Sequence, residues 1–211
     1  MNGKALITHV AEDGRVHGLE EHLRGTVERA GNEREDRLMQ ARRHVVVDVE
    51  TTGMSVARGG RVIEVGAVVI EEGRIVAELG TLIEVDAPIA AGAYRVHGSS
   101  PDMLLGKPTP AEVWPRFLEF VADAPLVAHN ASFDSTFIRH ELARLGKRFS
   151  NRWHCTVSRS RQALPHLPNH RLETVYRHLF GSLPGGAQTH RALDDARLTA
   201  RVWVAIEEGI E

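Results

Sequence analysis

The feature that most constrains the fold of this chain is a pair of long β-branched runs separated by a short segment. The first run reads VVVDVE at residues 45–50, and the second reads VIEVGAVVI at residues 62–70. A Glu-Glu-Gly turn at residues 71–73 leads into a third run at residues 74–79. Runs of this composition and length, bounded by turn residues, predict β-strands. We therefore expect three adjacent strands of a meander.

The second half of the chain predicts strands that alternate with helices. Apolar spacing indicates a helix over residues 110–121, a short buried strand at residues 126–128, and a helix after HNASFD that Gly146 closes. Further helices are expected over residues 172–180 and 192–208. Strands that lead directly into helices are typical of α/β proteins. We predict an α/β fold with one main domain, which a chain of 211 residues can supply with a buried core.

The first 43 residues differ in composition from the rest. Leu19, Leu23 and Val27 fall on one helical face within residues 18–30, and residues 32–43 are almost wholly charged. We predict a short helical N-terminal extension over residues 1–43 and the main domain over residues 44–211.

Composition indicates the cellular setting. No apolar run approaches the roughly 20 residues that span a bilayer, and the N-terminus lacks the pattern of a secretion signal. Cys155 is the only cysteine, which excludes an intramolecular disulfide. We expect a cytoplasmic protein with no membrane partner. The net charge of −2 does not exclude nucleic acid, because bound cations cancel acidic charge locally.

Three carboxylates lie at the ends of predicted strands. Asp48 and Glu50 are two residues apart, so their side chains leave the same face of one strand. Asp134 follows the strand at residues 126–128, and ligands gather at such strand ends in α/β sheets. Taken singly, each acid is also explained without a ligand. Acids are common on surfaces, and an acid in the first turn of a helix is stabilised by the helix dipole.

Helical geometry distinguishes the two neighbouring aspartates of the last predicted helix. Asp195 shares a face with small and apolar residues, whereas Asp194 shares one with Arg197 and Arg201. We therefore expect Asp195 to point inward and Asp194 outward. An acid that faces a core is costly unless it is paired, so Asp195 requires a cation or a hydrogen-bonding partner.

Together these residues predict a catalytic set of Asp48, Glu50, Asp134, Asp195 and His190. Oxygen ligands favour Mg²⁺ or Mn²⁺, and two such ions about 4 Å apart recur in phosphodiester hydrolysis. We expect two Mg²⁺ or Mn²⁺ ions as cofactors. His190 is the candidate general base, because an unperturbed histidine titrates at a pH of about 6.5.

Three segments, in this order, resemble the motifs of the DEDDh (DnaQ-like) 3′→5′ exonucleases: VDVETTG at residues 47–53, HNASFD at residues 129–134 and HRALDDA at residues 190–196. The likeness is greatest to the proofreading ε subunits of bacterial DNA polymerase III. RVIEVGAV at residues 61–68, VHG at residues 96–98 and PNHRLE at residues 168–173 extend it. The resemblance implies an RNase H-like mixed central sheet flanked by helices, two Mg²⁺ or Mn²⁺ ions, and release of nucleoside 5′-monophosphates.

The same resemblance implies a role for individual residues. It makes Asp48, Glu50, Asp134 and Asp195 metal ligands and His190 the general base. Residues in the first two motifs are assigned to substrate binding: Thr51, Thr52, Gly53, Met54, His129, Asn130 and Phe133. Met54 and Phe133 are candidates for an apolar wedge against a base.

We therefore expect a two-metal-ion exonuclease that acts on the 3′ end of single-stranded DNA, in proofreading, repair or end trimming. A 3′→5′ exoribonuclease is the alternative, because no residue here reads the 2′-hydroxyl unambiguously. A non-catalytic nucleic-acid-binding module is a second alternative. It is disfavoured because all five catalytic positions are filled.

Three protein partners are suggested by shorter likenesses. The ε resemblance implies a polymerase, although ε subunits continue into a polymerase-binding tail and this sequence ends at Glu211. Residues 162–167 (QALPHL) resemble a sliding-clamp-binding peptide, with a proline-containing loop as the alternative. Residues 9–30 resemble the start of the HD nuclease domain of CRISPR-associated helicase-nucleases, without its His-Asp pair. This implies a CRISPR-associated partner, with an amphipathic hairpin as the alternative.

Overall fold

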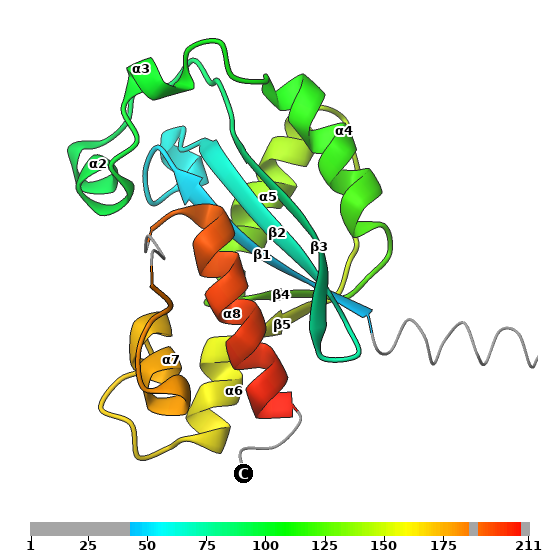
Figure 1. Ribbon diagram of the computed structural model, residues 1–211. Coiled ribbons are helices and arrows are strands. Elements are labelled where there is room, and N and C mark those ends of the chain that lie inside the picture. Colours follow the sequence, from blue (N-terminus) through cyan, green and yellow to red (C-terminus); the bar gives the residue numbers. More distant parts are fainter. Residues whose placement is uncertain (1–42, 186–189, 208–211) are drawn as a thin grey trace, which may run out of the picture. The chain divides into compact units, whose positions relative to one another are not determined.

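A computed structural model describes residues 43–185 and 190–207 (Figure 1). All of the predicted N-terminal extension except Arg43, including its HD-domain likeness, falls on residues outside this part, so the division into residues 1–43 and 44–211 stays a prediction. No helix within the described ranges combines the length and apolarity that crossing a bilayer requires.

One five-stranded mixed sheet forms the centre of the described part, in the order β3-β2-β1-β4-β5. The strands are β1 (Arg43–Thr51), β2 (Val62–Glu71), β3 (Arg74–Leu82), β4 (Leu126–Ala128) and β5 (Trp153–Cys155). β1, β2 and β3 pair antiparallel, which confirms the predicted meander. β4 pairs parallel with both β1 and β5. The expected α/β fold with a mixed central sheet is therefore confirmed.

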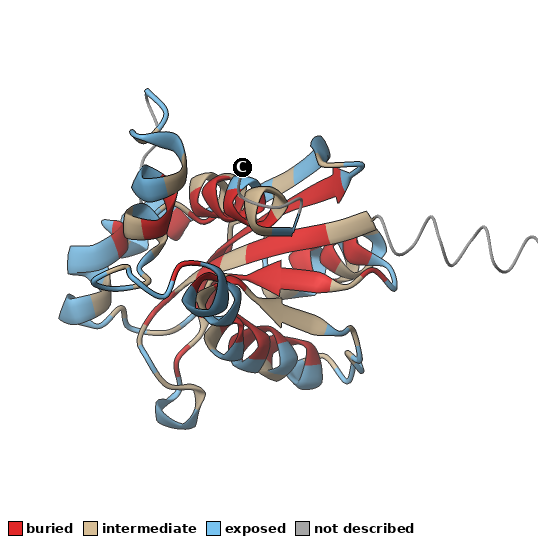
Figure 2. Cartoon of the chain, turned by 90° about the horizontal axis from the view of Figure 1, so that it is seen from below, coloured by how far each residue is buried: buried red, intermediate tan, exposed pale blue. Residues whose placement is uncertain are grey.

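Helices cover both faces of this sheet (Figures 1 and 2). They are η1 (Val56–Arg58), α2 (Ala91–His97), α3 (Pro101–Leu104), α4 (Pro110–Val121), α5 (Ala131–Arg144), α6 (Thr156–Ala163), α7 (Leu172–Phe180) and α8 (Ala192–Glu207). The helices predicted over residues 110–121 and 172–180 have the predicted bounds. α4 and α5 pack on one face, α8 packs on the other, and α6 and α7 pack against α8.

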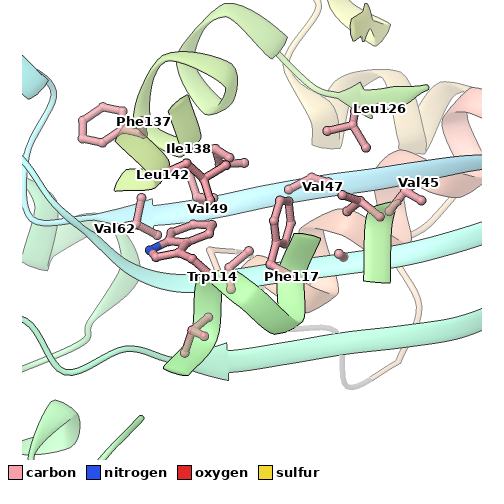
Figure 3. Packing of buried hydrophobic residues seen from close by; sticks show 14 of the residues in the cluster. Val45, Val47, Val49, Val62, Trp114, Phe117, Leu126, Phe137, Ile138 and Leu142 are labelled. Atoms are coloured by element: carbon pink, nitrogen blue, oxygen red, sulfur yellow. The ribbon is translucent and has the colours of Figure 1, made fainter. Parts of the chain in front are cut away.

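β1 is enclosed on both of its faces, which explains its continuous apolar run. Val45, Val47 and Val49 point into the cluster formed with α4 and α5 (Figure 3). Val46, on the opposite face, packs with residues of α8. Asp48 and Glu50 have the same parity as Val46, so this strand carries two acids onto the α8 side of the sheet.

α8 approaches the sheet closely because two glycines leave room for it. Gly66 of β2 and Gly80 of β3 are partners in register. A Cβ at Gly66 would lie 2.3 Å from the carbonyl of Ala192 and from the nitrogen of Leu193. A Cβ at Gly80 would lie 2.9 Å from a methyl carbon of Leu193. The first turn of α8 therefore rests directly on the backbone of two strands, as glycines within strands permit.

Gly66→Ala should therefore force α8 away from the sheet. The collision is with helix backbone, which no rotamer change can relieve, so unfolding free energy should fall by at least about 1–3 kcal/mol. Urea unfolding measures the change. Gly92→Ala is the matched control, because a Cβ there would lie 3.9 Å from its nearest neighbour, a side-chain atom of Arg95. An unchanged unfolding midpoint in Gly66→Ala would contradict this packing.

Candidate active site

Three elements bring the five predicted catalytic residues to one place. Asp48 and Glu50 come from the end of β1, Asp134 from the first turn of α5 and Asp195 from the first turn of α8. Ligand atoms of Glu50, His190 and Asp195 all lie within 4.8 Å of one another. The charges of Asp134 and Asp195 both act on Asp48, which places it in the same cluster.

The two acids of β1 are held in an environment that disfavours their charge. Burial, followed by repulsion from Asp134, Asp195 and Glu50, raises the pKa of Asp48 well above its usual range. Burial and the same kind of repulsion raise the pKa of Glu50 to about 8, although nearby Arg191 opposes this. Without a countercharge, these carboxylates are destabilised in their ionised form.

The two acids on the helices are similarly buried, with 3% of Asp134 and 8% of Asp195 exposed. Burial raises the pKa of Asp134 to about 8, against an opposing hydrogen bond from the backbone N–H of Val49. Burial also raises the pKa of Asp195 to about 6, and a hydrogen bond from the N–H of His190 opposes that shift. Each of these two helices thus presents one carboxylate group to the end of β1.

This set of donors fits a hard divalent cation. All four acids offer oxygen, and burial raises the pKa of each, so a bound cation would favour their ionised form. Oxygen donors of this kind suit Mg²⁺ or Mn²⁺. The two-ion set predicted from the sequence remains a proposal, as does the assignment of each ligand.

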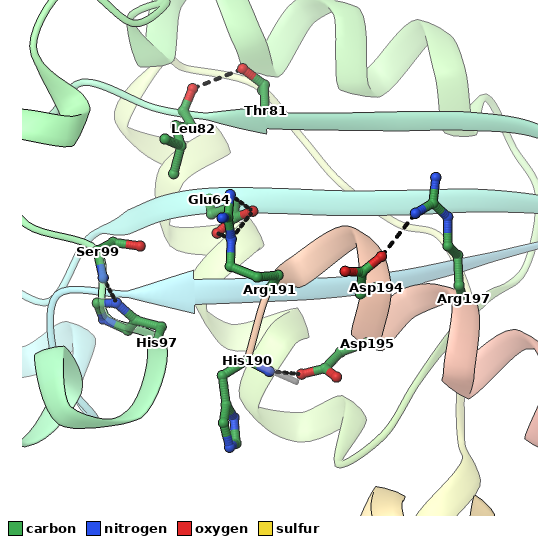
Figure 4. A network of polar contacts seen from close by, with 10 residues as sticks. All are labelled: Glu64, Thr81, Leu82, His97, Ser99, His190, Arg191, Asp194, Asp195 and Arg197. Atoms are coloured by element: carbon green, nitrogen blue, oxygen red, sulfur yellow. Dashed lines mark hydrogen bonds and ion pairs between the residues drawn. The ribbon is translucent and has the colours of Figure 1, made fainter. Parts of the chain in front are cut away.

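His190 lies at the entrance to α8, directly before its first turn. Its side chain is exposed, and its backbone N–H donates to Oδ2 of Asp195 at 2.9 Å. Asp195 points inward, while Asp194 on the next face pairs with Arg197 at 2.8 Å (Figure 4). The predicted directions of the two aspartates are therefore confirmed.

The turn after β1 uses its two threonines internally. The Thr51 hydroxyl donates to the carbonyl of Gly53 at 2.9 Å, and Thr52 Oγ1 accepts from the N–H of Arg61 at 2.9 Å. Both threonines are buried, whereas Met54 is 81% exposed. The threonine side chains stabilise the turn, and the Met54 side chain projects into solvent. The assignment of Thr51, Thr52, Gly53 and Met54 to substrate binding stays a proposal.

The substrate-binding candidates of the second motif differ in exposure. The His129 ring is engaged within the protein, with Nε2 2.9 Å from the carbonyl of His170 and Nδ1 2.8 Å from Oγ1 of Thr156. Asn130 is exposed and adopts a left-handed backbone, φ 78°, at the start of α5. The Phe133 ring lies 4.8 Å from that of Phe137 and is only partly buried. The structure thus gives His129 an internal role that the motif alone did not indicate.

Two ion pairs that involve buried glutamates were missed in the sequence. Arg61 binds Glu141, which is 1% exposed, with Nε–Oε1 2.7 Å and Nη2–Oε2 2.9 Å. Arg191 similarly binds Glu64, which is 4% exposed and lies opposite Glu50 in register. The available signal was an acid inside an apolar pattern: Glu64 interrupts VIEVGAVVI, and Glu141 falls on the apolar face of α5.

The segment predicted to bind a sliding clamp is partly built into the core. Leu164 is buried and Leu167 packs against the same cluster between α6, α7 and α8. Its two leucine side chains are therefore packed within the protein.

Fold and site together define an α/β protein whose acidic cluster could hold a metal ion, and comparison with known proteins places it in a family. Residues 45–203 match the model of the exonuclease family designated RNase_T. The DNA polymerase III subunit epsilon of Aquifex aeolicus is 37% identical over 165 residues, which are 78% of this chain and 80% of that protein. A PolC-type DNA polymerase III of Clostridium perfringens is 39% identical over 159 residues, 75% of this chain.

This chain spans only about a tenth, 11%, of that PolC-type protein. Among solved structures, exonuclease X in complex with 5′ overhanging duplex DNA is 28% identical with a TM-score of 0.64, covering 78% of this chain and 91% of that one. The chain belongs to the exonuclease family that includes the epsilon subunits of DNA polymerase III. The predicted membership of the DnaQ-like, DEDDh exonucleases with an RNase H-like fold is confirmed.

Burial lowers the pKa of His129 to about 4, from an ordinary value of 6.5. Between pH 4 and pH 6.5 the unfolded chain binds a proton at His129 and the folded chain does not. The free energy of unfolding therefore falls as pH falls from 6.5 towards 4, and this group has no effect on it above pH 6.5. His129→Gln should be less stable at pH 8, by about 0.5–1.5 kcal/mol for each hydrogen bond lost. That deficit should shrink towards pH 5 in urea unfolding. A deficit that stays constant with pH would contradict this account.

Proposed function

We propose that this protein is a 3′→5′ exonuclease that removes nucleotides from the 3′ end of single-stranded DNA and releases nucleoside 5′-monophosphates. The observation that carries the proposal is the convergence of four acids beside an exposed histidine, two of them half-buried on β1 and two buried at the starts of α5 and α8. Membership of an exonuclease family supports the same reaction class. The direction, the polymer and the ion count are proposals.

In this mechanism Asp48, Glu50, Asp134 and Asp195 would hold two Mg²⁺ or Mn²⁺ ions. When bound, these ions supply positive charge to the scissile phosphate and to the leaving 3′ oxygen. Glu50 and Asp195 lie beside His190, so this side of the site orients the attacking water. His190 accepts the proton of that water, and its exposed ring passes the proton on to solvent.

The turn after β1 and the start of α5 bind the terminal nucleotide. The backbone of Thr51, Thr52 and Gly53 borders the cation site, while exposed Met54 and partly buried Phe133 offer apolar surface to a base. Asn130 lies at the start of α5, next to these residues in the second motif.

The relatives connect this reaction with DNA replication. Some are named as subunits of DNA polymerase III and others as whole PolC-type polymerases. We propose a DNA strand end as the substrate, a cytoplasmic site of action, and a polymerase as a partner. A clamp is not proposed, because Leu164 and Leu167 are packed inside the protein.

A time course with 5′-labelled single-stranded DNA and a matched RNA tests the proposal. With Mg²⁺ or Mn²⁺, the DNA should shorten from its 3′ end as a ladder of single-nucleotide steps, and EDTA should stop it. A faster ladder on RNA would replace DNA by RNA as the substrate. Folded protein that binds metal but cleaves neither polymer would refute the exonuclease and favour a binding module.

Asp195→Asn and Asp194→Asn should differ sharply although the residues are neighbours. Removal of a partner that only supports a metal ligand costs about 10–100-fold, so loss of the Asp195 ligand should lower kcat by more than about 100-fold. Asp194 pairs outward with Arg197, so its variant should retain most activity. Initial rates and Mn²⁺ titration by calorimetry measure both effects. Equal losses in the two variants would refute the ligand assignment.

A further inference from the structure

His190 has a backbone conformation that few side chains adopt. Its φ is 65°, in the left-handed region, and it is not a glycine. Such a conformation is strained for an L-residue, and it persists where neighbouring contacts determine it. Those contacts therefore decide where the imidazole points.

One restraint comes from the site itself. The N–H of His190 donates to Oδ2 of Asp195, and the N–H of Asp195 donates to the carbonyl of Arg191 at 2.9 Å. These bonds close the first turn of α8 around the histidine. They fix the position of the His190 N–H relative to the first turn of α8.

The second restraint fastens this turn to the sheet. Arg191 Nε lies 3.1 Å from both carboxylate oxygens of Glu64, and Nη2 lies 3.1 Å from Oε1. Glu64 lies near the start of β2, and its side chain is 6% exposed. A forked pair of this kind fixes direction as well as distance. Figure 4 shows Arg191 extending towards Glu64 while the His190 ring extends the opposite way.

We propose that the Glu64–Arg191 pair is a positioning device that holds His190 in its left-handed conformation and directs its imidazole towards Glu50 and Asp195. The proposal rests on the proposed function, in which His190 is the base. Arg191 acts through His190 and not on the substrate, because its guanidinium is bound to Glu64 on the sheet side. The close contact of α8 with Gly66 and Gly80 sets the distance between this turn and the sheet, and the ion pair sets the rotation of the turn.

Arg191→Gln and Glu64→Gln should each lower kcat by about 10–100-fold, the usual effect of removing a partner that orients a catalytic group. KM should change little, because neither residue contacts the nucleotide. Arg191→Lys keeps the charge but loses the fork, so it should recover only part of kcat. The double variant should be no worse than the poorer single variant, since the two residues act as one unit.

Arg197→Gln is the matched control. Arg197 lies on the same helix and forms ion pairs with Glu78 and Asp194 on the outward side. Its variant should keep kcat even where stability falls. Losses of kcat in Arg191→Gln no greater than those in Arg197→Gln, or losses that track the unfolding midpoint across all variants, would overturn the positioning role.

A measurement without catalysis separates this proposal from the proposed function. The three-bond coupling between the amide and Hα protons of His190 reports its φ directly. It should change in Arg191→Gln and remain unchanged in Arg197→Gln. An unchanged coupling in Arg191→Gln refutes the positioning role even in an active enzyme. A changed coupling in a protein that cleaves neither DNA nor RNA supports the positioning role and refutes the exonuclease.

Discussion

The gathering of four carboxylates in a poorly solvated site is the constraint on which the rest of this structure depends. Burial and like charge raise the pKa of Asp48 and of Glu50, so the chain alone does not favour their approach in ionised form. The fold must supply the energy that holds them together. It does so by enclosing β1 between two apolar layers, so that the strand cannot move without exposing its valines.

Each segment that brings an acid to this point has an anchor that is not itself a candidate ligand. Arg61 and Glu141 tie the segment after β1 to α5, the helix that carries Asp134. Glu64 and Arg191 tie β2 to the start of α8. Breaking either pair would leave a buried charge unpaired, which is costly. Their value lies less in net stability than in geometry, because a forked pair fixes the orientation of the segment that bears it.

The sequence predicted what local pattern determines. β-branched runs indicated the meander, and the 3.6-residue period distinguished Asp195 from Asp194. β5 escaped prediction because Trp153–Cys155 is short and only half-buried, without the wholly apolar composition that revealed the equally short β4. The close packing of α8 on the sheet was not predicted, because a glycine within a strand indicates that something approaches its backbone but not which element does so. The Arg61–Glu141 pair joins residues 80 positions apart, and the internal hydrogen bonds of His129 depend on a loop 41 positions away. Such contacts exist only once the chain is folded.

Substitution of a candidate metal ligand and substitution of an ion-pair anchor have different physical consequences. Removing a ligand charge relieves repulsion, so the folded chain without cations gains stability while the cation site is lost. Removing an anchor leaves every ligand charge in place and frees the segment that carried it, so stability and geometry decline together. Stability and activity should thus change in opposite directions on substitution of Asp48 and in the same direction on substitution of Glu64. That contrast distinguishes a residue that binds the cation from one that fixes the position of a ligand-bearing segment.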